Sequence, residues 1–418
     1  MRLGSRRRLR WVLAVFGLVG LSATAGFASA VNRTLETDGT VGYYTSVAVG
    51  ADGNPVISHL DFSNEDLELY VCADATCTTG TNRELETAGS VGWYSSIAIG
   101  DDGNPVISHY NATNNDLELY VCDDPTCTTG TNQTLETTGN VGFNPAVAIG
   151  ADGNPVISHY DDTNEDLELY VCDDPTCTSG TNQTLSTAGD VGWYTSIAIG
   201  ADGNPVISHY DNSNEDLELY VCDDPTCTSG TNQELATASF VGWYTSIAIG
   251  ADDNPVISYH DNANSDLELY VCADPTCASG TSRTLETAGH VGSYTSVAID
   301  ADGNPVIGHQ DLTNNDLELY VCDDPTCASG TNQELATAGS VGFMVSVAIG
   351  ADGRPIVSHY NDTNGDLELY VGSATTPTTT TTVAPTTTTT TVVVAPPVVA
   401  PPTAVPADPV TGPPTFTG

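Results

Sequence analysis

The stretch "DLELYV", residues 66–71, decides the fold because it returns unchanged at residues 116, 166, 216, 266, 316 and 366. The chain around it repeats every 50 residues with no insertion. Each repeat holds four strand-like runs: VGYYTSVAVG from Val41, NPVISHLD from Asn54, DLELYV, and NRTLET or a variant, first at Asn32. An Asp-Gly-Asn-Pro turn separates the first two runs. Four short strands in a unit of this length, repeated seven times, predict a β-propeller.

The two ends of the array favour a closed ring over an open solenoid, which is the competing architecture. A solenoid needs atypical capping repeats, and neither end of this array is atypical. Instead, the array starts with a fourth strand at Asn32 and stops after a third strand at Val371. We therefore predict an all-β, seven-bladed propeller of four-stranded antiparallel blades over residues 31–371, in which residues 32–37 complete the last blade.

Twelve cysteines form six pairs, each with four residues between its members, in the loop from the third to the fourth strand. The seventh repeat has no pair, as expected if these two strands come from opposite ends of the chain there. Local pairs in an exported protein indicate disulfides, each worth about 2 kcal/mol in so short a loop. Zinc is a weaker alternative, because no histidine accompanies each pair. The pairs are Cys72/Cys77, Cys122/Cys127, Cys172/Cys177, Cys222/Cys227, Cys272/Cys277 and Cys322/Cys327.

The flanking segments carry export and spacer signals. Residues 1–30 have a basic start, an apolar middle and a small-residue cleavage site at Ala28-Ser29-Ala30, which predicts a signal peptide and a mature chain from Val31. Ser5-Arg6-Arg7 leaves Sec and twin-arginine export both open. Residues 372–418 are rich in Thr, Pro, Val and Ala, and we expect a disordered tail or stalk. We predict a secreted protein, extracellular or cell-wall associated, with no membrane span.

The charge balance excludes two classes of partner. Without the signal peptide the chain keeps four arginines against 54 Asp and Glu, a formal charge of 4 − 54 = −50, and it has no lysine. Such a surface repels nucleic acid and anionic membranes. Two explanations of the acidity remain open, with the first favoured: adaptation to a saline medium, or the collection of divalent cations such as calcium.

The run SIAIGADGNPVISHYDNSNEDLELYVC, residues 196–222, resembles the repeat of secreted bacterial β-propellers. Its order of strand, Asp-Gly turn, strand, Asp-x-x-Asn loop and strand is similar to NHL-type blades. The resemblance spans residues 32–371 and implies an architecture much more than an activity. The cysteine pairs and the 50-residue length depart from NHL units, and the Asp-box of sialidase-like propellers is missing.

Aromatic residues at the start of the first strand are the best ligand candidates. By propeller topology they open near the central channel, on the same face as the Asp-x-x-Asn-x-Asp loops. Flat rings beside amides and carboxylates suit the faces and hydroxyls of sugars, so we expect a glycan or protein ligand there. The alternative is that these rings pack between blades. The candidates are Tyr43, Trp93, Tyr94, Trp193, Tyr194, Trp243, Tyr244 and Phe343, with Tyr44, Phe143 and Tyr294 at matching positions.

Two further repeated patterns invite a metal hypothesis. The Asp-x-x-Asn-x-Asp loops offer oxygen ligands for calcium, although Asx turns explain the same residues. A histidine recurs on the second strand, first at His59, and strand pairing places it opposite Glu68. Tyr259 takes this position in the fifth repeat and can bond Glu268 instead, so we predict a structural pair. The calcium candidates are Asp161, Asn164, Asp166, Asp211, Asn214 and Asp216.

Catalysis is disfavoured by the near-identity of the repeats. An active site needs unlike groups in unlike roles, whereas seven similar blades offer the same groups seven times. We therefore expect a non-catalytic, monomeric binding or surface-interaction module without a cofactor other than calcium. The alternative is an extracellular polysaccharide lyase or hydrolase that uses the acidic face.

Overall fold

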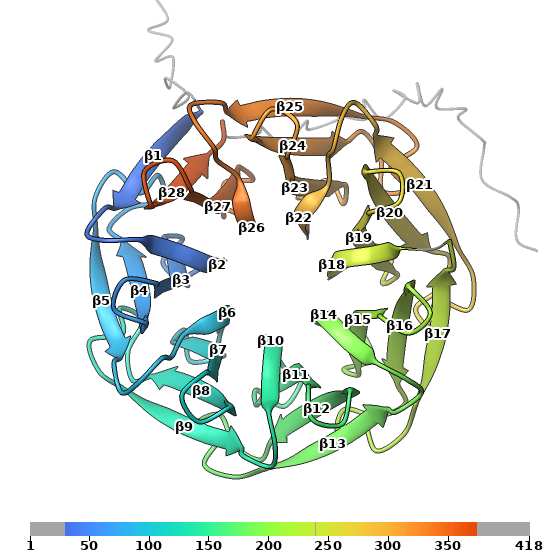
Figure 1. Cartoon of the computed structure of the whole chain (residues 1–418), viewed down its shortest axis with the longest axis horizontal. Coiled ribbons are helices and arrows are strands. Elements are labelled where there is room, and N and C mark those ends of the chain that lie inside the picture. The colour runs from blue at the N-terminus through green and yellow to red at the C-terminus, as the bar shows by residue number, and fades with distance from the viewer. Residues whose placement is uncertain (1–29, 239, 374–418) are drawn as a thin grey trace, which may run out of the picture. The chain divides into compact units, whose positions relative to one another are not determined.

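The computed structural model describes residues 30–238 and 240–373, and in this range the chain forms seven four-stranded antiparallel sheets around a central channel (Figure 1). The predicted seven-bladed propeller is confirmed. The predicted signal peptide, apart from Ala30, and the predicted tail beyond Ser373 lie outside the described residues. No helix in the described part of the chain has the length and apolarity needed to cross a bilayer.

Each blade runs from an inner strand at the channel to an outer strand at the rim. The inner strands are β2 (Val41–Val49), β6 (Trp93–Ile99), β10 (Val141–Ile149), β14 (Val191–Ile199), β18 (Val241–Ile249), β22 (Ser293–Ile299) and β26 (Phe343–Ile349). The second strands are β3 (Pro55–Asp61), β7 (Pro105–Asn111), β11 (Pro155–Asp161), β15 (Pro205–Asp211), β19 (Pro255–Asp261), β23 (Pro305–Asp311) and β27 (Pro355–Asn361). The third strands are β4 (Asp66–Cys72), β8 (Asp116–Cys122), β12 (Asp166–Cys172), β16 (Asp216–Cys222), β20 (Asp266–Cys272), β24 (Asp316–Cys322) and β28 (Asp366–Val371). The outer strands are β5 (Gly80–Glu86), β9 (Gly130–Glu136), β13 (Gly180–Ser186), β17 (Gly230–Ala236), β21 (Gly280–Glu286), β25 (Gly330–Ala336) and β1 (Val31–Glu36).

The ring closes through β1, which is the outer strand of the seventh blade. It pairs antiparallel with β28, with Asn32 opposite Tyr370 and Arg33 opposite Leu369. The Asn32 amide also donates a 2.6 Å hydrogen bond to Glu368. Both sheet edges that an open array would leave are therefore paired, as predicted.

The hydrophobic core lies between neighbouring blades. In one cluster, Val41 and Ile57 of the first blade pack with Leu367 and Val371 of the seventh, and the same arrangement recurs around the ring. The second strands have a neighbouring blade on each side, and six of the seven, such as β3, are buried along their whole length; in β27 only Pro355 is partly exposed. Their Val, Ile and aromatic residues are suited to this environment.

All six predicted disulfides are present, each with Cα atoms 4.8 or 4.9 Å apart. The sequence prediction placed both cysteines of a pair in the loop, and this is wrong for the first, which is the last residue of the third strand. The second cysteine lies in the loop in a left-handed conformation, with φ of 49° at Cys77, and its N–H donates to the carbonyl of Asp74 at 2.8 Å. The bridges join Cys72 to Cys77, Cys122 to Cys127, Cys172 to Cys177, Cys222 to Cys227, Cys272 to Cys277 and Cys322 to Cys327.

Each bridge is buried in a core between blades; the Cys72–Cys77 bridge, for example, faces the seventh blade. In four of the six cases the loop closed by the bridge also accepts a hydrogen bond from the outer strand of the preceding blade. Arg33 Nε donates to the Thr76 carbonyl at 2.9 Å, and Gln183 Nε2 donates to that of Thr226 at 2.6 Å. The disulfides therefore shape contacts between blades as well as loops.

Candidate functional site

The second residue of each aromatic start lines the mouth of the central channel. Together with their neighbours these residues enclose a cavity of about 390 Å³. Five of the seven positions hold tyrosine, and we call the seven residues the tyrosine belt. The belt consists of Tyr44, Tyr94, Asn144, Tyr194, Tyr244, Tyr294 and Met344.

A backbone distortion turns the belt residues toward the channel. Each has a left-handed backbone conformation, with φ of 51° at Tyr44 and 46° at Asn144. The pairing register of β2 with β3 shifts on both sides of Tyr43, so β2 bulges here. Gly42, also at positive φ, lets the strand approach the preceding blade, since a Cβ there would lie 2.8 Å from Leu367 Cα. Left-handed tyrosines are strained, and such strain is typical of functional sites.

Neighbouring tyrosine rings of the belt contact one another as tilted pairs. Tyr44 and Tyr94 have ring centroids 4.3 Å apart and planes at 49°. The corresponding values are 4.8 Å and 51° for Tyr194 and Tyr244, and 4.5 Å and 36° for Tyr244 and Tyr294. Blades related by one seventh of a turn, about 51°, give such an angle when the ring planes run along the channel axis, and the first two pairs match it.

The belt hydroxyls stay neutral at ordinary pH. Burial raises the pKa of Tyr194 to about 12, and the nearby Tyr294 and Tyr94 add to the shift. The pKa of Tyr44 and of Tyr244 is raised as well, first by burial and then by neighbouring tyrosines. Neutral phenols both donate and accept hydrogen bonds, which suits a ligand rich in hydroxyl groups.

The first residue of each aromatic start takes a different position. Tyr43 packs against Tyr360 of the preceding blade with ring centroids 4.3 Å apart, and Trp193 packs against Tyr160 at 5.1 Å. The Trp193 indole also donates to Asp190 at 2.6 Å. The structure thus divides the predicted ligand residues. Tyr94, Tyr194 and Tyr244 belong to the belt. The other five contact aromatic rings of a neighbouring blade, and Trp193 also borders the cavity; they are Tyr43, Trp93, Trp193, Trp243 and Phe343.

Two belt residues were not among the sequence candidates, namely Asn144 and Met344. The sequence does carry a signal for them, because both occupy a position that is tyrosine in the other five repeats. Residues 145 and 345 are exceptions too: Pro145 and Val345 stand where the other blades have Thr or Ser. The sevenfold symmetry is therefore broken among the residues that line this cavity.

The predicted calcium loops use their oxygen atoms in turns. The Asp161 carboxylate accepts hydrogen bonds from the backbone of Thr163 and Asn164 and from the Asn164 amide, the last at 2.7 Å. Asp211 makes the same contacts with Ser213 and Asn214. Burial raises the pKa of Asp166 and Asp216. Among the described residues no group of three or more His, Cys, Asp or Glu side chains is arranged to hold a metal ion; calcium stays a prediction.

In six blades the recurring histidine is one of three residues, on three neighbouring strands, that are linked by side-chain hydrogen bonds; we call this the three-residue chain. The predicted opposition of His59 and Glu68 is confirmed. An asparagine of the outer strand joins them: His59 Nε2 lies 3.2 Å from Asn82 Oδ1, and Asn82 Nδ2 donates to Glu68 at 2.8 Å. Burial lowers the pKa of His59 to about 4, so the imidazole is neutral at pH 7.

The fifth blade makes the same connection with different residues. Tyr259 bonds the Ser282 hydroxyl at 2.6 Å, and Ser282 donates to Glu268 at 3.0 Å. Sequence reasoning missed the asparagine, although the signal was present, because Ser282 replaces it only in the blade where Tyr259 replaces histidine. The paired exchange indicates a structural role for this chain of contacts.

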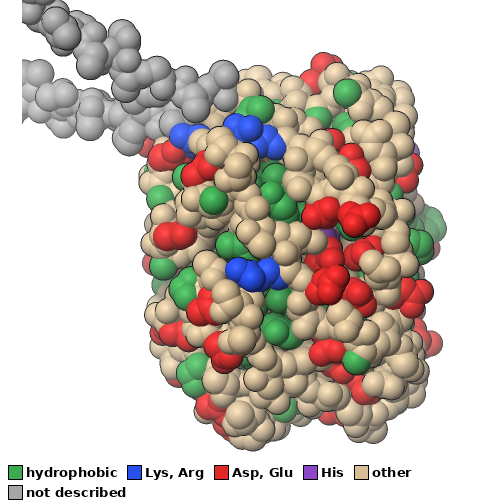
Figure 2. All heavy atoms as spheres, turned by 90° about the vertical axis from the view of Figure 1, so that its left-hand side faces the viewer, with side chains coloured by type: hydrophobic (Ala, Val, Ile, Leu, Met, Phe, Trp, Pro, Cys, Tyr) green, Lys and Arg blue, Asp and Glu red, His purple; other side chains and the backbone are tan. Residues whose placement is uncertain are grey.

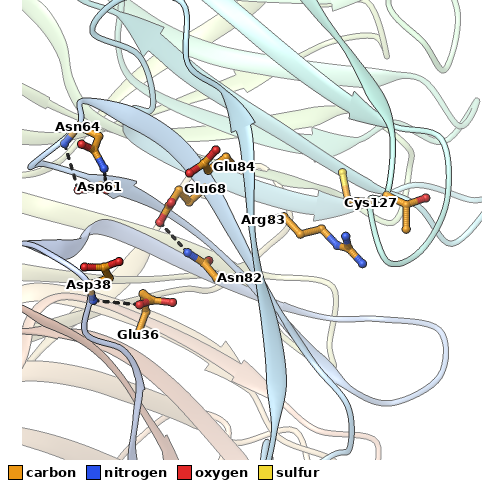
Figure 3. A pocket seen from close by; sticks show the side chains of 10 residues that line it. Glu36, Asp38, Asp61, Asn64, Glu68, Asn82, Arg83, Glu84 and Cys127 are labelled. Carbon is orange, nitrogen blue, oxygen red and sulfur yellow. Dashed lines mark hydrogen bonds between the residues drawn. The ribbon is translucent and has the colours of Figure 1, made fainter.

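A second cavity, of about 470 Å³, is acidic and lies where β1 meets the first blade (Figure 3). Glu36, Asp61, Glu68 and Glu84 line it, and Arg83 points from it toward the loop of Cys127 (Figure 3). Burial raises the pKa of Glu68 to about 7, and the negative charges of the other three acids add to the shift. Acidic side chains are spread over this wall of the ring and arginines are few (Figure 2).

No protein-family model matches the chain, and no curated protein matches it in sequence. Among solved structures, a protein of unknown function from Dyadobacter fermentans is similar with a TM-score of 0.51 and 12% identity, over 74% of this chain and 98% of that one. The polysaccharide lyase Uly1 is similar with a TM-score of 0.52 and 10% identity, over 85% of this chain and 94% of that one. At such identities the likeness shows the propeller fold alone, and no family assignment follows.

Proposed function

We propose that the protein is a secreted, monomeric, non-catalytic binding module that holds a carbohydrate at the tyrosine belt. The observation that carries the proposal is the 390 Å³ cavity, which is lined by five tyrosines and by the two residues that replace tyrosine, Asn144 and Met344. Tyrosine rings and neutral hydroxyl groups are suited to the faces and hydroxyls of sugars, and the size is typical of small-ligand sites. Six disulfides are typical of extracellular proteins and support the export part of the proposal.

A glycan array, read with and without calcium, tests the proposal when belt variants are included. Tyr94→Phe and Tyr244→Phe keep the ring contacts and remove the hydroxyls, so we expect at least a tenfold loss of binding with an unchanged melting temperature. Tyr110→Phe is the matched control, because its hydroxyl bonds Asn140 at 2.8 Å away from the cavity. If no glycan binds, or if the belt variants bind as the wild type does, the proposal is wrong.

A hydrolase or lyase is the second candidate, favoured by one observation. Glu68, with its raised pKa, lies in one cavity with other carboxyl groups, and glycoside cleavage uses a pair of carboxyl groups as acid and base. The same environment recurs around Glu218 and Glu318, which fits a structural role better. Release of reducing ends or unsaturated products from a polysaccharide panel is the test. Cleavage that is lost in Glu68→Gln and retained in Glu218→Gln would replace the binding proposal with an enzyme.

A further inference from the structure

The two exceptions in the tyrosine belt lie across the channel from each other. Asn144 is on β10 and Met344 is on β26, which stand on opposite sides of the ring (Figure 1). Between them run one arc of two tyrosines, Tyr44 and Tyr94, and one arc of three. The mouth of the channel therefore has two distinct poles.

The pole at Asn144 is polar. No described side chain or backbone group is hydrogen-bonded to the Asn144 amide, although the residue borders the cavity. An unpaired amide offers two N–H donors and a carbonyl acceptor. It is therefore ready to bond a pair of neighbouring hydroxyl groups on a ligand.

The pole at Met344 is apolar, and two residues near it differ from their equivalents in the other blades. Val345, which is 8% exposed, replaces the Thr or Ser of five other blades. In the blade before it Gly308 replaces serine, and a Cβ there would lie 2.7 Å from Val345 Cγ1. Four of the five interfaces that keep both hydroxyl residues have a hydrogen bond between them, as Thr195 and Ser158 do at 2.6 Å, whereas Thr45 and Ser358 have none. This one interface has exchanged a polar pair for an apolar one.

Met344 is held in place at the edge of this pole. The backbone N–H of Tyr44 donates to Met344 Sδ at 2.9 Å, so the thioether is fixed against the neighbouring inner strand. A ligand hydroxyl placed against Met344 and Val345 would lose its bond to water and gain none, which is unfavourable. A methyl group at the same place would leave no polar group unpaired and would bury apolar surface.

We propose that the channel mouth selects a sugar ring that carries a methyl group, either a 6-deoxyhexose or an N-acetylhexosamine. The hydroxyls face Asn144 and the tyrosine hydroxyls, and the methyl group lies on Met344 and Val345. This inference rests on the proposed function, because it names the sugar class for the same cavity. The expected preference over the matched sugar without the methyl group is roughly ten- to a hundredfold, the range for one small group in a pocket.

Matched pairs of free sugars test the inference. Ligand-observed NMR titrations would compare L-rhamnose with L-mannose, L-fucose with L-galactose, and N-acetylglucosamine with N-formylglucosamine. In at least one pair we expect the methyl-bearing sugar to bind at least tenfold more tightly. The near-isosteric changes Met344→Gln and Val345→Thr should each reduce that ratio severalfold. Val321→Thr, on the third strand of the sixth blade, is the control and should leave the ratio unchanged.

The outcomes separate this inference from the proposed function. The absence of a preference for the methyl-bearing sugar in every pair, or a preference that survives both Met344→Gln and Val345→Thr, overturns the inference. Absence of binding by all six sugars overturns it as well. In each of these cases a glycan-array signal that Tyr94→Phe abolishes would still support carbohydrate binding at the belt.

Discussion

Replacing Glu84 by threonine is expected to stabilise the protein at alkaline pH. On β4 and β5, Glu84 lies directly opposite Glu68. In the third blade the equivalent residue is Thr184, whose hydroxyl donates to Glu168 at 3.0 Å. The first blade therefore has a second carboxylate where the third has a hydrogen-bond donor. The fourth and sixth blades share this feature, with Glu234 and Glu334 at the same place.

The size of the effect follows from the pKa of the partner glutamate. The pKa of Glu68 rises from 4.5 to about 7, and Glu218 and Glu318 show the same rise. A shift of this size corresponds to about 3 kcal/mol. Burial is the largest cause of this shift, and the facing carboxylate adds a smaller part that solvent screens, so we assign about 1 kcal/mol to each pair.

The sign of the pH dependence is fixed by the direction of the shift. A glutamate whose folded pKa is raised loses stability as the pH rises from its unfolded value, 4.5, through about 7. The triple variant Glu84→Thr, Glu234→Thr, Glu334→Thr should therefore match the wild type at pH 4. At pH 8 it should be more stable by about 2 to 3 kcal/mol, the sum for three distant pairs.

Chemical unfolding between pH 4 and pH 9, followed by tryptophan fluorescence, measures the difference. Thr134→Glu in the second blade is the reverse control and should introduce a new loss of stability above pH 6. If the free energy of unfolding depends on pH in the same way in the wild type and in the triple variant, the facing carboxylates have no effect and the reasoning is wrong.

Three other changes probe closure, the disulfides and the three-residue chain. Asn32→Ala removes the bonds to Glu368 and His359, and thermal unfolding should show a loss of about 1 to 3 kcal/mol; an unchanged melting temperature would mean that closure does not depend on this amide. Cys122→Ser with Cys127→Ser should cost about 2 kcal/mol in denaturant unfolding, and the variant should then be less sensitive to a reductant than the wild type; equal stability would assign the bridge no role. Tyr259→His and Ser282→Asn should each destabilise the fifth blade, while the double variant recovers at least 1 kcal/mol; additive losses in that double-mutant cycle would contradict the coupling.

Much of the architecture could be predicted because it depends on patterns that repeat in the sequence. The closing strand could be predicted because the array starts with a fourth strand and stops after a third. The opposition of His59 and Glu68 followed from the short loop between their strands and the two-residue period of a strand. The channel mouth was harder to predict. A period of two treats Tyr43 and Tyr44 as residues on opposite faces, but the bulge at this point decides which of them reaches the channel.

The candidate site also depends on differences between repeats, whereas the fold depends on what they share. A search for recurring aromatic residues finds the tyrosines and necessarily passes over Asn144 and Met344. Likewise Asn82 is one polar residue among many on an exposed outer strand, and its contact with His59 appears only once the register of three strands is known. The strand propensity of a local sequence does not predict which distant residues pair.

The pairing of β1 with β28 places Val31 opposite Val371, which is 371 − 31 = 340 positions away in the chain. During synthesis the first strand emerges before any partner exists, and it has to remain unpaired until the last blade is complete. Assembly of the ring therefore ends with its most non-local contact, which is the slowest kind to form. A circularly permuted gene that begins at Val41 and carries the β1 segment after β28 would make this contact a hairpin, and it should refold faster to the same final state.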